Sequence, residues 1–233
     1  MAGYTLYGMG SPNVVKVAIA LEELGQSYDL VHVNVFQGEQ REPWFLALNP
    51  NGKVPALVES REGGDSILFE SGAIMDRLAM RHGAFGGADA DGQALVGQWL
   101  MFQMANCGPV FGNAIHFTFA TQDNPYGANR FQIELRKLLK VIEQRLAASD
   151  YLARDYSIAD MALWPWIRTL EMFFADDLKT PALRRWFAEI EARPAVTSAI
   201  ARMDAIGKLD RQARREASAE QLDRYFGRVA WPD

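Results

Sequence analysis

Patterns typical of β-strands are confined to the first 70 residues of this 233-residue chain. Four short segments there are rich in strand-forming residues or alternate between apolar and polar side chains. They lie at 4–7, 28–35, 54–59 and 66–69. Beyond residue 93 the apolar residues recur at helical spacing instead. We therefore expect a small α/β domain followed by a larger all-helical domain.

The first strand segment leads into a well-marked helix start. Ser11 suits the N-cap position and Pro12 suits the first position of a helix. Apolar residues at helical spacing follow as far as Gly25, which suits a C-terminal cap. The alternating segment 28–35 comes next, so the chain begins strand, helix, strand. This order favours a parallel βαβ unit.

A hairpin and another helix complete the first predicted domain. The segments 54–59 and 66–69 flank the pair Gly63–Gly64, and a helix is predicted over 71–81. The order βαβ and then ββα is that of a thioredoxin-like domain with a mixed four-stranded sheet. We place this domain at 1–83, a linker rich in Gly, Ala and Asp at about 84–92, and the helical domain at 93–233.

The helical domain contains several separate periodic segments. Ser157 and Asp160 have the spacing of a capping box at the start of one of them. The charged tail after residue 207 is compatible with a helix that packs back or with a frayed end. The predicted helices cover roughly 93–118, 126–148, 158–174, 182–192 and 195–206.

Composition excludes several classes of function. The net charge of −5 disfavours a nucleic-acid-binding protein, and no run of about 20 apolar residues predicts a membrane span. The chain has one cysteine and three scattered histidines, so we expect neither an internal disulfide nor a metal site. Its first residues lack the pattern of a secretion signal. Together these features predict a cytoplasmic protein.

The run NPNGKVPAL at residues 49–57 places Pro55 at the start of a strand, where it cannot donate to the sheet. If the Val54–Pro55 bond is cis, the turn exposes the backbone N–H and C=O of Val54 to an extended ligand. The other interpretation is a trans proline that merely begins an edge strand. The motif alone is compatible with both.

The run LFESGAI at residues 68–74 marks a strand that ends where a helix begins. Free N–H groups at a helix start attract carboxylates, and Ser71 adds a hydroxyl donor. Glu70 adds a negative charge for an amine. A ligand with an α-amino acid end would satisfy both residues. The alternative is a capping serine next to a glutamate that complements the helix dipole.

These elements, in this order, resemble those of a glutathione transferase from residue 4 to about 203. The Nu-class group of bacterial disulfide-bond oxidoreductases, related to the yeast prion regulator, is the most similar. The resemblance is carried by SPN (11–13), NPNGKVPAL, LFESGAI, QWLMFQMANCGPVFGN (98–113), YGANRF (126–131) and YSIADMALWPW (156–166). This group carries a threonine where Ser11 stands, and serine keeps the hydroxyl.

The resemblance implies a role for each matching residue. Glu70 and Ser71 would hold the γ-glutamyl end of glutathione, and Val54, before a cis Pro55, would pair with the cysteinyl backbone. The other implied contacts are Lys53 and Gln40 near the glycyl carboxylate, Ser11 and Asn13 beside the sulfur, and Arg130 from the helical domain.

The implied protein is a glutathione-dependent homodimer that reduces disulfides with the glutathione thiolate as co-substrate. Two alternatives stay open: conjugation of electrophiles as the main reaction, and a regulator that binds glutathione without catalysis.

Two other residues compete for the catalytic role. Tyr7 ends the first strand, where some transferase classes place the tyrosine that stabilises the thiolate, but a strand tyrosine is more often a packing residue. Cys107 has no partner cysteine, so we expect a buried small apolar side chain there. The sequence therefore favours Ser11 and Asn13 over both.

Overall fold

The computed structural model describes residues 3–120 and 124–231, and packing divides the chain into two compact units. The first unit combines the residues up to Ile74 with those from Ala195 onward, and the second spans Met75–Pro194. The boundaries expected from the sequence group the residues after 195 with the other helices, whereas packing groups them with the sheet. No helix among the described residues is long and apolar enough to cross a membrane.

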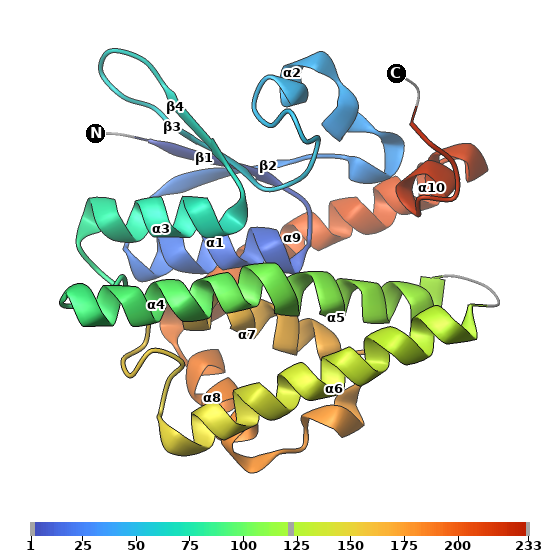
Figure 1. The fold of residues 1–233 in the computed structure, drawn as a ribbon. Helices are drawn as coiled ribbons and strands as arrows, with labels where there is room; N and C mark the ends of the chain where they lie inside the picture. Colours follow the sequence, from blue (N-terminus) through green and yellow to red (C-terminus); the bar gives the residue numbers. More distant parts are fainter. Residues whose placement is uncertain (1–2, 121–123, 232–233) are drawn as a thin grey trace. The chain divides into compact units, whose positions relative to one another are not determined.

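The first unit has the thioredoxin-like order of elements. Figure 1 shows α1 on one face of its sheet and α2 on the other. Its elements are β1 (Tyr4–Gly8), α1 (Pro12–Glu23), β2 (Tyr28–His32), η1 (Val35–Gln37), η2 (Glu39–Arg41), α2 (Pro43–Leu46), β3 (Ala56–Glu59), β4 (Ser66–Phe69), the first turn of α3 (Ser71–His82), α9 (Pro194–Glu216) and α10 (Ala219–Tyr225).

The four strands form a mixed sheet, as predicted, and their order is β2-β1-β3-β4. β1 runs parallel to β2, and β3 runs antiparallel to both of its neighbours. In the register, Tyr7 pairs with Ala56, and Ala56 pairs with Phe69. The end of β1, the start of β3 and the end of β4 therefore lie at the same end of the sheet.

Helix α1 is buried on all of its faces along most of its length, not only on the face that apolar periodicity predicts. Every residue from Val14 to Leu21 is buried. Gly25 follows the helix with φ of 63°, a left-handed conformation that glycine adopts without steric cost. The second strand is shorter than predicted. It ends at His32, and the chain turns at Asn34, whose side chain accepts the Gln37 N–H at 3.2 Å.

The described part of the second unit is helical. Its elements after α3 are α4 (Ala90–Phe102), η3 (Gln103–Cys107), α5 (Gly108–Ile115), η4 (His116–Ala120), α6 (Pro125–Ala148), α7 (Ile158–Leu170), η5 (Ala175–Leu178) and α8 (Pro181–Glu191). The predicted helix at 93–118 is interrupted by π-helical turns at η3 and η4. Pro109 follows η3 and lacks an N–H, so it cannot complete the α-helical ladder there.

The predicted capping box at the start of α7 is confirmed. Ser157 Oγ accepts the Ala159 N–H at 3.3 Å, and the Asp160 carboxylate accepts the Ser157 N–H at 3.1 Å. Asp160 is fully buried and also accepts from Leu152 N at 3.0 Å and Trp186 Nε1 at 2.9 Å. One carboxylate thus joins the start of α7 to α8 and to the preceding loop.

The charged tail after residue 207 forms helices, which is one of the two outcomes that the sequence allowed. α9 continues ten residues beyond the predicted end at 206, to Glu216. It does so because Ile206 and Ala213 keep an apolar face that is buried in the first unit. α10 follows, with its own capping box between Ser218 and Gln221. The tail is therefore mostly helical as far as Tyr225.

Candidate functional site

Three loops of the first unit meet at one end of the sheet. They are the loop after β1, the loop before β3 and the junction of β4 with α3. The strand register brings them together, although they are far apart in sequence. Eight of the nine predicted site residues belong to this unit, and Arg130 belongs to the other.

The loop after β1 carries Ser11 at the start of α1. Its backbone carbonyl accepts the N–H groups of Val14 and Val15, both at 3.1 Å. Its side chain makes no capping hydrogen bond, and among the described residues its buried Oγ has no partner. Asn13, the second residue of the helix, is partly buried. The Ser11 hydroxyl therefore has hydrogen-bonding capacity that no described residue satisfies.

The loop before β3 is held by the buried side chain of Asn49. Its Nδ2 donates to the Lys53 carbonyl at 2.6 Å, and its Oδ1 accepts the Asn51 N–H at 3.0 Å. The Val54–Pro55 bond is cis, which confirms the prediction. The Lys53 side chain is exposed and Val54 is partly buried. The two hydrogen bonds of the Asn49 side chain thus stabilise the loop directly before β3.

The third loop places two polar residues at the start of α3. Glu70 is exposed and has φ of 66°, in the left-handed region that non-glycine residues seldom adopt. Its carbonyl accepts the Ile74 N–H at 2.9 Å, so Ser71 is the first helical residue rather than the cap. Ser71 is buried, with 3% of its surface exposed.

A buried lysine lies behind Ser71, and sequence reasoning missed it. Lys16 is 1% exposed, and its Nζ donates to Ser71 Oγ at 3.5 Å. This ammonium adds positive charge close to a helix N-terminus, which already favours anions. The signal in the sequence was a cation within the continuous apolar stretch Val14–Leu21. Pattern analysis treats such a residue as solvent-exposed, because lysine is almost never fully buried unless it is paired.

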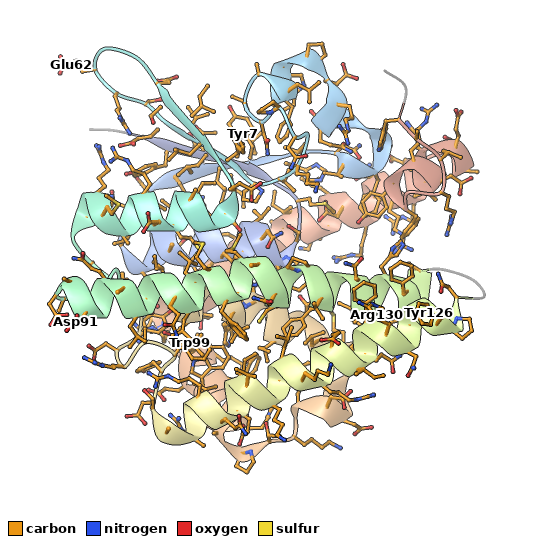
Figure 2. The ribbon with its side chains drawn as sticks, in the orientation of Figure 1. Tyr7, Glu62, Asp91, Trp99, Tyr126 and Arg130 are labelled. Atoms are coloured by element: carbon orange, nitrogen blue, oxygen red, sulfur yellow. The ribbon has the colours of Figure 1, made fainter. Side chains whose placement is uncertain are left out.

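Gln40 and Arg130 differ in their surroundings. Gln40, in η2, is 5% exposed, and among the described residues its Oε1 has no hydrogen-bond partner. Its backbone oxygen lies close to Gly52, where a Cβ would be 3.0 Å from it, so η2 adjoins the loop before β3. Arg130 lies on α6 with an exposed side chain (Figure 2).

The two competing residues are packed. Tyr7, labelled in Figure 2, packs against the apolar cluster of Val33, Phe45 and Ala56. Its ring centroid lies 6.0 Å from that of Trp44. Cys107 is fully buried at the end of η3 and forms no disulfide. Across the described residues, no cluster of three or more His, Cys, Asp or Glu could hold a metal ion.

Comparison with known proteins identifies the family. The glutathione S-transferase N-terminal domain matches residues 2–79, and the C-terminal domain of the same family matches residues 117–194. The chain belongs to the glutathione S-transferase family. The four-stranded sheet and the helical unit described above are the two domains of this fold.

Within the glutathione S-transferase family, the chain is similar both to a disulfide-bond oxidoreductase and to a transcriptional regulator. It is 38% identical over 200 residues to the disulfide-bond oxidoreductase YfcG of Escherichia coli, covering 84% of this chain and 93% of YfcG. It is 31% identical over 243 residues to the transcriptional regulator URE2 of Saccharomyces cerevisiae, covering 86% of this chain and 68% of URE2.

A solved glutathione transferase from Pseudomonas putida, with one glutathione disulfide bound per subunit, has the same fold. It matches with a TM-score of 0.80 and 35% identity, over 84% of this chain and 90% of that one.

Proposed function

We propose that this protein is a glutathione-dependent disulfide-bond oxidoreductase that uses the thiolate of bound glutathione. One observation carries the proposal: the buried Ser11 hydroxyl has no partner among the described residues and lies at a helix start. It shares its end of the sheet with Val54 and Ser71, which are suited to bind a peptide. The similarity to YfcG and to the glutathione-disulfide-bound transferase supports the same conclusion.

The peptide is held along its backbone and at both ends. Val54 offers its N–H and C=O to the cysteinyl residue, as an added strand would. Ser71, backed by Lys16, receives the α-carboxylate of the γ-glutamyl end, and Glu70 receives its ammonium. The left-handed conformation of Glu70 costs about 1–3 kcal/mol, and strain of this kind persists where a function requires the position.

The glycyl end lies toward η2 in this arrangement. Gln40 lies on η2 next to the loop before β3, and Lys53 supplies an exposed cation for the terminal carboxylate. The contact of Arg130 that the family resemblance implies stays a prediction.

Ser11 and Asn13 activate the thiol. A free thiol has a pKa of about 8.5, so only a few per cent is thiolate at pH 7. A hydrogen bond to a charged group contributes about 1.5–3 kcal/mol, and one pKa unit corresponds to about 1.36 kcal/mol. One well-placed donor therefore lowers the thiol pKa by about one to two units, which makes the thiolate a major form.

The reaction needs no protein cysteine. The thiolate of bound glutathione attacks one sulfur of the substrate disulfide and forms a mixed disulfide, and the other sulfur leaves as a thiolate that takes up a proton. A second glutathione thiolate attacks the mixed disulfide, which yields glutathione disulfide and the second reduced thiol. The fully buried Cys107 takes no part.

Binding to immobilised glutathione, followed by assays with a model disulfide and a model aryl halide, tests the proposal. We expect retention on the resin and reduction of the disulfide. A faster reaction with the aryl halide would make conjugation the main activity. Retention without either reaction would favour a regulator, the role that the name of URE2 describes. Failure to bind glutathione would refute the proposed site.

A further inference from the structure

The loop that carries Ser11 is tied to a residue two hundred positions later in the chain. Asp210, on α9, accepts the Gly10 N–H through Oδ2 at 2.7 Å. Its other oxygen, Oδ1, lies 2.9 Å from Nε2 of His32. Asp210 is 9% exposed, and Gly10 directly precedes Ser11. One buried carboxylate thus joins the ends of β1 and β2 to α9.

The Asp210 carboxylate leaves no room for a side chain at Gly10. A Cβ at this position would lie 2.7 Å from Asp210 Oδ2, well inside van der Waals contact. A side chain of any size would therefore push the carboxylate away. Hydrogen bonds to an ionised acceptor are roughly twice as strong as neutral ones, and a buried carboxylate without a donor is costly. The contact thus fixes the loop at the residue beside Ser11.

The segment that follows Asp210 supports the neighbouring loops as well. Ala213 forms a buried cluster with Met9 and Phe36, and Val54 packs against the same cluster. On α10, the ring centroid of Tyr225 lies 4.4 Å from the ring centroid of Phe36. Residues of α9 and α10 therefore lie behind the loop after β1, behind η1 and behind Val54.

We propose that Asp210 is a positioning residue for the thiol chemistry. By holding Gly10, it keeps the Ser11 hydroxyl aimed at the sulfur of bound glutathione. Asp210 itself touches no ligand. This inference rests on the function proposed above and adds a residue that lies outside the three glutathione-binding loops. The peptide contacts of Val54 and Ser71 have their own supports in Asn49 and Lys16, so they do not depend on Asp210.

Four variants test the inference: Asp210→Ala, Asp210→Asn, Gly10→Ala and Asp204→Ala. Asp204 is an exposed residue on the same helix and provides the matched control. For each variant, the measurements are the Kd for glutathione, the pH profile of kcat/KM for disulfide reduction, and the urea midpoint. With glutathione saturating and the disulfide varied, the apparent pKa in the pH profile reports the thiol of bound glutathione.

For Asp210→Ala we expect about a tenfold lower kcat/KM at pH 7 and a profile shifted by about one unit toward higher pH. The Kd for glutathione should change less than about threefold, because the peptide contacts remain. Asp210→Asn keeps an acceptor for the Gly10 N–H and should retain most of the activity. Gly10→Ala should reproduce the loss, because the new methyl group displaces the carboxylate. Asp204→Ala should behave as the unmodified protein.

Two results would overturn the inference. One is an unchanged pH profile and rate in Asp210→Ala. The other is a loss of glutathione binding in proportion to a lower urea midpoint, with no rescue by asparagine, which would make Asp210 a stabilising residue only. Failure of the unmodified protein to bind glutathione would refute the proposed function as well, and it would be seen before any substitution was made.

Discussion

At the scale of single residues, the site contains two serine hydroxyls whose hydrogen bonding is unusual. The Ser71 hydroxyl lies against the buried ammonium of Lys16, and the Ser11 hydroxyl has no partner among the described residues. Neither serine acts as a simple helix cap, the alternative that the sequence left open. Ser71 follows the cap position, and Ser11 occupies it without using its side chain.

Substitution of Ser71 tests where the γ-glutamyl end of glutathione binds. We expect Ser71→Ala to weaken glutathione binding by about 10- to 100-fold, because it removes a donor to a carboxylate worth about 1.5–3 kcal/mol. Calorimetric titration with glutathione measures this loss. Ser71→Thr keeps the hydroxyl and is the matched control. Glutathione affinity that is unchanged in Ser71→Ala would show that the γ-glutamyl end binds elsewhere.

Four substitutions distinguish the residues that could act on the thiol. Ser11→Ala and Asn13→Ala should each lower kcat/KM for disulfide reduction at least about tenfold, equivalent to about 1.4 kcal/mol of barrier. Cys107→Ser should keep nearly all activity, and Tyr7→Phe should cost little, since Tyr7 packs in an apolar cluster. An inactive Cys107→Ser beside an active Ser11→Ala and Asn13→Ala would indicate a protein-thiol mechanism instead.

At the scale of elements, the start of α7 contains a buried acid. Burial raises the pKa of Asp160 to about 6, although hydrogen bonds from Leu152, Trp186 and Ser157 act in the opposite direction. The folded state therefore holds the proton more tightly than the unfolded state, in which the carboxyl keeps an ordinary pKa near 3.8. The contribution of Asp160 to stability is greatest below pH 4 and is lost as the pH rises through 6.

A comparison with Asp160→Asn tests this pH dependence. Relative to the asparagine variant, the unmodified protein should lose on the order of 3 kcal/mol in free energy of unfolding between pH 4 and pH 7. Urea unfolding across this range measures the difference. Asp89→Asn alters an exposed carboxylate at the N-cap of α4 and serves as the control. A pH-independent difference would mean that the hydrogen bonds fully offset burial, and a gain in stability over this range would mean that they outweigh it.

At the scale of the whole molecule, local sequence patterns predicted the order of helices and strands. They did not predict the contacts between residues that are distant in the sequence. Pro55, Glu70 and Ser71 were found from the sequence because turn and helix-start residues have strong local preferences. Lys16 and Asp210 were not, because their roles depend on residues 55 and 200 positions away. The helical tail was also uncertain, since its few apolar residues are separated by charged ones and their packing partners lie far away in the sequence.

The assembly of the molecule is a further expectation. The family resemblance implies a homodimer, and α3 and α4 expose the apolar side chains of Met80 (70%) and Met101 (55%). Such side chains are better covered than left in water. Light scattering should therefore give about twice the chain mass of 26.1 kDa. Elution at the mass of a single chain would contradict the dimer.

The sheet unit is built from two separate segments of the chain, and this has a consequence for biosynthesis. Its two parts, the residues up to Ile74 and those from Ala195 onward, are made on either side of the whole helical unit. At roughly 5–20 residues per second, translation of Met75–Pro194 takes roughly 6–24 s. During this interval the nascent sheet lacks α9, and the Asp210 carboxylate that accepts the Gly10 N–H has not yet been made. The Gly10 contact can thus form only when the last helices leave the ribosome.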